Sequence, residues 1–173
     1  PRQVADHVRL RGIKTILNLR GPSTRGYYLL EKEACELNGV ELIDFQVYSR
    51  DTPTVETVLA AKKLFESIEY PALMHCKSGA DRAGIMSVLY MIFRMGEPVG
   101  VAIQQLSKKY LHMREGKTGL LDAFFETYLD AEKATSISFE DWLQSEYDRE
   151  KVKADFLSSG KGKLRLDWIL RRE

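Results

Sequence analysis

Two short apolar runs separated by a helical pattern constrain the fold of this chain more than any other feature. Residues 13–19 (IKTILNL) form an apolar run bounded by turn residues, which is typical of a strand buried on both faces. Residues 27–39 have helical spacing and end in an Asn-Gly stop signal, and residues 40–47 have the length and β-branched content of a second strand. The order β-α-β predicts an α/β fold with a short, mostly parallel central sheet flanked by helices.

The rest of the chain continues this pattern and then becomes helical. Thr52 and Pro53 fit the N-cap and first position of a helix that runs to Ile68, and residues 72–75 are predicted to be a short buried strand. A mainly helical C-terminal third follows. The other predicted helices, along the whole chain, cover residues 3–12, 82–96, 98–109, 120–134 and 139 to about 157. The last of them has Ser138 as its N-cap.

Length and composition favour one domain over residues 1–173, with a helical C-terminal extension from about residue 138. A chain of 173 residues with 44% hydrophobic side chains can bury a substantial core without disulfides or metals. Twenty-six Lys and Arg against 25 Asp and Glu give a net charge of +1, so we expect no nucleic-acid partner. We expect a monomer.

Two cysteines, Cys35 and Cys76, are too few for a disulfide scaffold, and no CxxC or Cys/His pairing indicates a zinc site. We therefore expect no metal and no other cofactor.

The longest apolar stretch, residues 83–93, is far shorter than the roughly 20 residues of a membrane helix. The chain begins at Pro1 rather than Met, so a signal peptide or anchor upstream stays open; the cytoplasm is the default location. The basic tail, residues 160–173, is interpreted as a solvated end with apolar residues docked on the body.

The stretch HCKSGADR, residues 75–82, combines two requirements of phosphoryl transfer to sulfur. A cysteine in a loop that leads to a helix N-terminus lies near partial positive charge, which lowers the thiol pKa from about 8.5 into the range of roughly 3.5 to 7.5. The small or permissive residues 77–81, with Gly79 central, allow successive backbone N–H groups to form an anion-binding nest. Arg82 can then hold two phosphate oxygens at once.

This stretch resembles the Cys-x5-Arg signature of the protein tyrosine phosphatase and dual-specificity phosphatase superfamily, in particular its small bacterial and plant or fungal members. The resemblance extends more loosely over residues 13–95, including GIKTILNLRG and SRDTP. It implies that Cys76 is the nucleophile that forms a phosphocysteine and that Arg82 binds phosphate and stabilises the transition state. The substrate-binding residues would be Lys77, Ser78, Gly79, Ala80, Asp81 and Arg82, with His75 supporting the loop by hydrogen bonding.

The resemblance leaves the general acid open. Family members take it from an aspartate upstream of the cysteine, where Asp44 lies in a strand pattern and Asp51 lies in the loop before a helix. We favour Asp51. Some phosphoinositide-directed relatives have the acid immediately before the loop arginine, which is the position of Asp81 here; the alternative for Asp81 is that it only braces the loop.

One position departs from the family pattern, because Ala83 replaces the Ser or Thr that stabilises the leaving sulfur in the second step. We therefore expect slow breakdown of the phosphoenzyme.

The predicted function is a cysteine-dependent phosphatase acting on phosphorylated proteins, lipids (including phosphoinositides, which Lys77 would suit) or small molecules. The alternative is a pseudophosphatase that captures a phosphorylated partner. A rhodanese-like arsenate reductase or cell-division-cycle phosphatase fits the SRDTP loop and the long C-terminal helices poorly.

Overall fold

The structure, a computed structural model, describes residues 2–160. Within them the chain forms two compact units, one made of residues 2–47 and 67–77 and the other of residues 48–66 and 78–160. The tail beyond Gly160, for which docking on the body is predicted, lies outside the described residues. That the whole chain is one domain stays a prediction.

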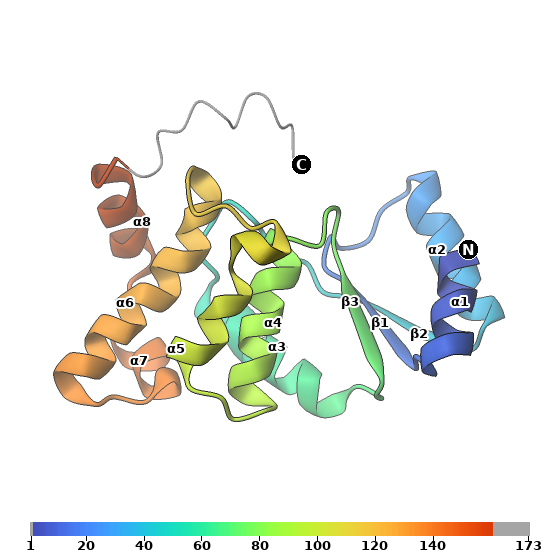
Figure 1. Cartoon of the computed structure of the whole chain (residues 1–173), viewed down its shortest axis with the longest axis horizontal. Helices are drawn as coiled ribbons and strands as arrows, with labels where there is room; N and C mark the ends of the chain where they lie inside the picture. Colours follow the sequence, from blue (N-terminus) through green and yellow to red (C-terminus); the bar gives the residue numbers. More distant parts are fainter. Residues whose placement is uncertain (1, 161–173) are drawn as a thin grey trace. The chain divides into compact units, whose positions relative to one another are not determined.

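A three-stranded parallel sheet organises the first unit. Its strands are β1 (Thr15–Asn18), β2 (Glu41–Asp44) and β3 (Ala72–His75), in the order β2-β1-β3 (Figure 1). All four residues of β1 are buried, as expected for a strand with a neighbour on each side, whereas β2 is partly exposed at the edge. Asn18 pairs with Asp44 on one side and with His75 on the other, so the three strands end together at one edge of the sheet.

Two helices, α1 (Arg2–Arg11) and α2 (Gly26–Leu37), lie side by side in this unit (Figure 1). Their apolar residues pack with those of the sheet in one cluster, formed by Val4, Ile13, Ile16, Ala34, Cys35 and Val40. Cys35 is buried, and burial raises the pKa of its thiol to about 11. Cys35 is therefore a packing residue, as its helical surroundings indicate.

The second unit is helical. It contains α3 (Val55–Ser67, whose last residue belongs to the first unit), α4 (Asp81–Phe93), α5 (Val99–Ala102), α6 (Leu120–Thr135), α7 (Phe139–Ser145), α8 (Arg149–Ser158) and the 3-10 turns η1 (Ile103–Gln105), η2 (Lys108–Tyr110) and η3 (Lys117–Gly119). Aromatic rings of α6, α7 and the following loop fill its core: Phe124 lies 5.6 Å from Trp142 and 5.0 Å from Tyr147, measured between ring centroids.

Two helix starts were predicted from capping residues, and one of them is wrong. Ser138 caps α7, because its hydroxyl accepts a hydrogen bond from the backbone N–H of Asp141 at 3.1 Å. The cap of α3 is Thr54 rather than Thr52, since the Thr54 hydroxyl accepts from the N–H of Thr57 at 3.2 Å. Thr52 lies in the preceding loop, so Pro53 precedes the helix instead of opening it.

Two predicted helices are broken. The segment 98–109 is α5 followed by two 3-10 turns, because Leu106 leaves the helical path and its side chain packs against Gly84 of α4. The segment 139–157 divides into α7 and α8, because Asp148 caps a new helix by accepting from the N–H of Lys151 at 3.0 Å. The α/β fold class, with a parallel sheet and a helical C-terminal third, is confirmed. Among residues 2–160 no helix has the length and apolar character needed to cross a bilayer.

Candidate functional site

The cysteine loop joins the carboxyl end of β3 to the amino end of α4. His75 ends the strand, residues 76–80 form the loop, and Asp81 opens the thirteen-residue helix. Gly79 has φ +73°, a left-handed conformation that favours glycine. Cys76 is partly exposed and Lys77, Ser78 and Gly79 are exposed. No side chain caps α4 at Ala80, so the first N–H groups of the helix have neither intrahelical partners nor a capping side chain.

His75 is held from two directions. Its Nε2 lies 2.8 Å from Oε1 of Glu31 on α2, and its Nδ1 lies 3.4 Å from the carbonyl oxygen of Cys76. The pairing with Glu31 raises the pKa of His75 against the effect of burial. An imidazole anchored to a helix and contacting the cysteine backbone is suited to supporting the loop, the role expected for it. Glu31 was not foreseen, because nothing in its helical context distinguishes it from a solvated glutamate.

At the same edge of the sheet, Asn18 ties neighbouring segments together. Its Nδ2 donates to the carbonyl of Gly21 at 2.8 Å and to Oδ1 of Asp44 at 2.7 Å. The other carboxylate oxygen of Asp44 accepts from the hydroxyl of Tyr28 at 2.5 Å, and this bond raises the pKa of Tyr28 to about 12. Asp44, although exposed, thus has two hydrogen-bond donors at the end of the edge strand β2.

Asp81 contacts a histidine that the sequence pattern did not connect with it. Oδ1 of Asp81 lies 2.9 Å from Nδ1 of His112, and Nε2 of the same ring lies 2.7 Å from Oδ2 of Asp122 on α6. The side chains of His112, Asp81 and Asp122 are only 0%, 7% and 4% exposed. Burial opposes protonation of the ring, yet the hydrogen bonds to Asp122 and Asp81 raise the pKa of His112 to about 9. His112 is therefore a buried residue and not a surface one.

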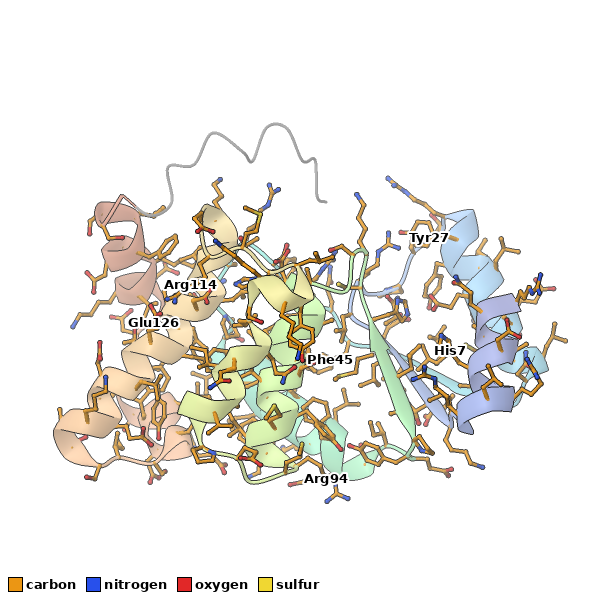
Figure 2. All side chains as sticks on the ribbon, viewed as in Figure 1. His7, Tyr27, Phe45, Arg94, Arg114 and Glu126 are labelled. Atoms are coloured by element: carbon orange, nitrogen blue, oxygen red, sulfur yellow. The ribbon has the colours of Figure 1, made fainter. Side chains whose placement is uncertain are left out.

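The chain of charges continues outward from Asp122. Its Oδ1 lies 3.2 Å from Nε of Arg114, and the Arg114 guanidinium also pairs with Glu126 (Figure 2). These three residues line a cavity of about 440 Å³, together with Glu115, Gly119, Phe156 and Gly160. Residues 2–160 hold no group of three or more His, Cys, Asp or Glu side chains that could bind a metal ion.

Asp51 is bound by helix α8. Lys153 Nζ lies 2.8 Å from its Oδ1, the Arg149 guanidinium pairs with its Oδ2, and the backbone N–H of Thr52 donates to Oδ1 at 2.9 Å. Arg149 and Tyr147 also donate to the carbonyls of Thr52 and Pro53, at 3.0 and 2.7 Å. The hydrogen bond to Asp51 raises the pKa of Lys153. The loop that carries Asp51 is therefore fastened to the C-terminal helix.

The predicted site residues consequently lie in three different structural environments. Residues 76–82 form one continuous loop and helix start, Asp81 is turned toward His112, and Asp51 is turned toward Arg149 and Lys153. Sequence reasoning missed Glu31, and it missed His112 and Asp122, which are ten positions apart in a segment without a motif. Their meeting depends on how the turn before α6 returns to α4.

Comparison with solved structures places this fold among phosphatases. TpbA of P. aeruginosa aligns over 90% of this chain and 80% of its own, with 16% identity and a TM-score of 0.57. Tk-PTP in its active form covers 73% and 85%, with 19% identity and a TM-score of 0.54. A putative phosphatase of Neisseria meningitidis covers 76% and 87%, with 24% identity and a TM-score of 0.51. No curated protein matches the sequence.

A family model gives the more specific result. The model described as "DSP-PTPase phosphatase fused to NAD+ Kinase" (PTP-NADK) matches residues 5–125, which include the whole sheet, the cysteine loop, α4 and both carboxylates that contact His112. The matched span is more than half of the 173 residues. The chain therefore belongs to the PTP-NADK family of dual-specificity-type phosphatases.

Proposed function

We propose that this chain is a cysteine-dependent phosphatase that hydrolyses phosphomonoesters through a phosphocysteine. The observation that carries the proposal is the loop of residues 76–82. It leaves the carboxyl end of a parallel strand, turns at Gly79 with φ +73° and enters a helix that begins one residue before Arg82. Such a loop directs backbone N–H groups toward a common anion.

In the proposed reaction the Cys76 thiolate attacks the phosphorus atom, and the bond from phosphorus to the ester oxygen breaks as the sulfur-phosphorus bond forms. The backbone N–H groups of residues 77–82 and the Arg82 guanidinium hold the non-bridging oxygens, and an acid gives its proton to the leaving alcohol. Water then attacks the phosphocysteine, which releases inorganic phosphate and returns the thiolate.

The acid that we propose is Asp51. Its carboxylate is one-third exposed and lies in a loop, so it can turn toward a leaving group if its bonds to α8 open. Asp81 is nearly buried, with one oxygen on His112. We infer that Asp81 braces the loop instead.

The acid assignment is tested with Asp51→Asn and Asp81→Asn on an aryl phosphate and an alkyl phosphate. An alkoxide leaving group needs the proton far more than a phenolate, so losing the acid should lower alkyl phosphate turnover by about 100-fold or more and aryl phosphate turnover much less. We expect this pattern for Asp51→Asn. Asp130→Asn, at an exposed carboxylate of α6, is the matched control. The same pattern in Asp81→Asn alone would transfer the role to Asp81.

For the substrate we propose a phosphomonoester on a protein or a lipid. The TpbA structure in complex with pTyr supports phosphotyrosine as a candidate. A second anionic group, as in a phosphoinositide, would be favoured by exposed Lys77 and by Arg20 in the loop after β1. The Arg20 guanidinium lies 4.0 Å from the ring centroid of Tyr27 on α2. Turnover of a phosphotyrosine peptide, a phosphoserine peptide and phosphoinositides separates these classes.

The proposal as a whole is tested by phosphate release from an aryl phosphate with the wild type, Cys76→Ser and Cys35→Ala. Cys35→Ala alters the other thiol, which is buried in the core, and should retain activity. Cys76→Ser should abolish it, and activity that survives this change would refute the mechanism. Ala83, which lacks the hydroxyl that would stabilise the leaving sulfur, favours one alternative function, a pseudophosphatase. A wild-type protein that binds a phosphopeptide but shows no turnover would establish that function.

A further inference from the structure

Asp81 poses an electrostatic problem for a phosphate-binding loop. It is the first residue of α4 and the neighbour of Arg82, so its carboxylate lies on the turn whose N–H groups would face the phosphate. An uncompensated negative charge at this position would repel a phosphate dianion. A cation in contact with Asp81 would offset that repulsion.

His112 has the geometry of such a cation. A neutral imidazole has one donor and one acceptor nitrogen, whereas an ionised carboxylate only accepts. Both ring nitrogens of His112 face carboxylates, Asp81 at 2.9 Å and Asp122 at 2.7 Å, so both bonds form only when the ring carries two protons. The pKa of His112, raised to about 9, agrees with a protonated ring at neutral pH.

The second carboxylate, Asp122, shares the charge of His112 but does not depend on it alone. Asp122 has a cationic partner of its own, because its Oδ1 lies 3.2 Å from Nε of Arg114. The four side chains Asp81, His112, Asp122 and Arg114 thus alternate in sign, and Glu126 adds a further carboxylate beyond Arg114. Removing the proton from His112 would leave Asp81 as the uncompensated member nearest to Arg82.

We propose that His112 is a positioning residue for phosphate binding, which neutralises Asp81 and fixes the first turn of α4 on which Arg82 lies. The inference rests on the proposed function only in that residues 76–82 receive a phosphate group. His112 lies in the segment between α5 and α6, so a residue outside the loop sets the charge of the loop.

A double-mutant cycle on phosphate affinity tests the proposal. Binding of inorganic phosphate is measured by calorimetry at pH 7 for the wild type, His112→Asn, Asp81→Asn and the double variant. Asparagine keeps a hydrogen-bond donor near the position of Nδ1 but carries no charge. We expect His112→Asn to weaken phosphate binding about tenfold, the effect of one uncompensated charge at a partly screened distance.

The diagnostic result is recovery in the double variant. If His112 acts by neutralising Asp81, removing the Asp81 charge as well should restore phosphate affinity to within about twofold of Asp81→Asn alone. A purely structural role predicts instead that the double variant binds at least as weakly as His112→Asn, and that result would overturn the proposal. His7→Asn, on the first unit's α1, is the matched control and should leave phosphate binding unchanged.

A pH series keeps the test valid if His112→Asn does not fold. It uses Cys76→Ser, which removes the active-site thiol, with and without Asp81→Asn. The charged groups facing His112 are Asp81 from α4 and Asp122 from α6, with Arg114 and Glu126 beyond them. Phosphate affinity should fall as the pH rises through about 9 in Cys76→Ser. Once Asp81 is Asn the fall should be smaller and lie at lower pH, because Asp81 is one of the carboxylates that raise the pKa of His112. The same fall in both proteins would contradict the role of His112.

Turnover of an aryl phosphate, measured on the same variants that retain Cys76, separates this inference from the proposed function. Loss of His112 should raise KM more than it lowers kcat, because the residue acts on phosphate binding. A wild type that binds phosphate with the predicted dependence on His112 but hydrolyses nothing would refute the proposed function and leave this inference standing.

Discussion

Nδ1 of His112 lies 2.9 Å from Oδ1 of Asp81, the residue immediately before the phosphate-loop arginine. The contact joins the start of α4 to the segment before α6, and Asp122 holds the other side of the ring. A segment outside the Cys-x5-Arg signature therefore contributes a buried partner to the loop.

This contact predicts how stability depends on pH. The pKa of His112 is raised from 6.5 to about 9 in the folded chain, so protonation stabilises the fold. The contribution should be complete below about pH 6.5 and lost as the pH rises through about 9, and it is on the order of 3 kcal/mol. Urea unfolding of the wild type and His112→Asn between pH 6 and 10 should show a difference that narrows at alkaline pH. A difference independent of pH would contradict the prediction.

A second prediction concerns Glu31 and His75. The pairing of His75 with the Glu31 carboxylate raises the imidazole pKa, so Glu31→Gln should lower it toward its ordinary value. An NMR titration of the His75 ring protons measures this change. Glu33→Gln, an exposed position on the same helix, should leave the His75 pKa where it is in the wild type. Equal values in all three proteins would mean that Glu31 does not anchor the ring.

Ala83 predicts burst kinetics. A hydroxyl at this position would stabilise the sulfur as it leaves phosphorus, and loss of one donor to a developing anion can cost about 100-fold in rate. Ala83→Ser should therefore raise kcat and shrink the burst of alcohol release in rapid-quench measurements. Ser87→Ala, which removes a hydroxyl bonded to the Ala83 carbonyl at 2.8 Å, is the control and should keep the burst. An unchanged burst in Ala83→Ser would refute slow dephosphorylation.

Position 119 has no room for a side chain. A Cβ there would lie 2.1 Å from the carbonyl oxygen of Arg114 and 2.9 Å from Cζ of Phe156, so the backbone would have to move. Gly119→Ala should destabilise the fold by about 3 kcal/mol, the upper part of the range for overpacking. Gly100→Ala offers a matched control, because a Cβ there would meet only Leu129 at 3.8 Å. Equal midpoint temperatures of thermal unfolding for Gly119→Ala and Gly100→Ala would show that the Gly119 backbone can relax.

The sequence by itself determined the local features of this protein. The apolar runs at residues 13–19, 40–47 and 72–75 predict three strands, because parallel strands buried in a sheet have few polar positions. The small residues after Cys76 and the helical pattern from Arg82 predict the strand-loop-helix unit. Helix ends were less reliable: Thr52 and Thr54 are equally good caps in a sequence, and only packing selects between them.

Only the tertiary structure decided which distant residues meet the loop. The pairs of His75 with Glu31, Asp81 with His112 and Asp51 with Arg149 join residues that are 44, 31 and 98 positions apart. No periodicity encodes such pairs, because each depends on how a helix returns to the sheet or to another helix. The sequence alone therefore indicates which residues can carry phosphate chemistry, and the fold assigns the partners that set their charge and orientation.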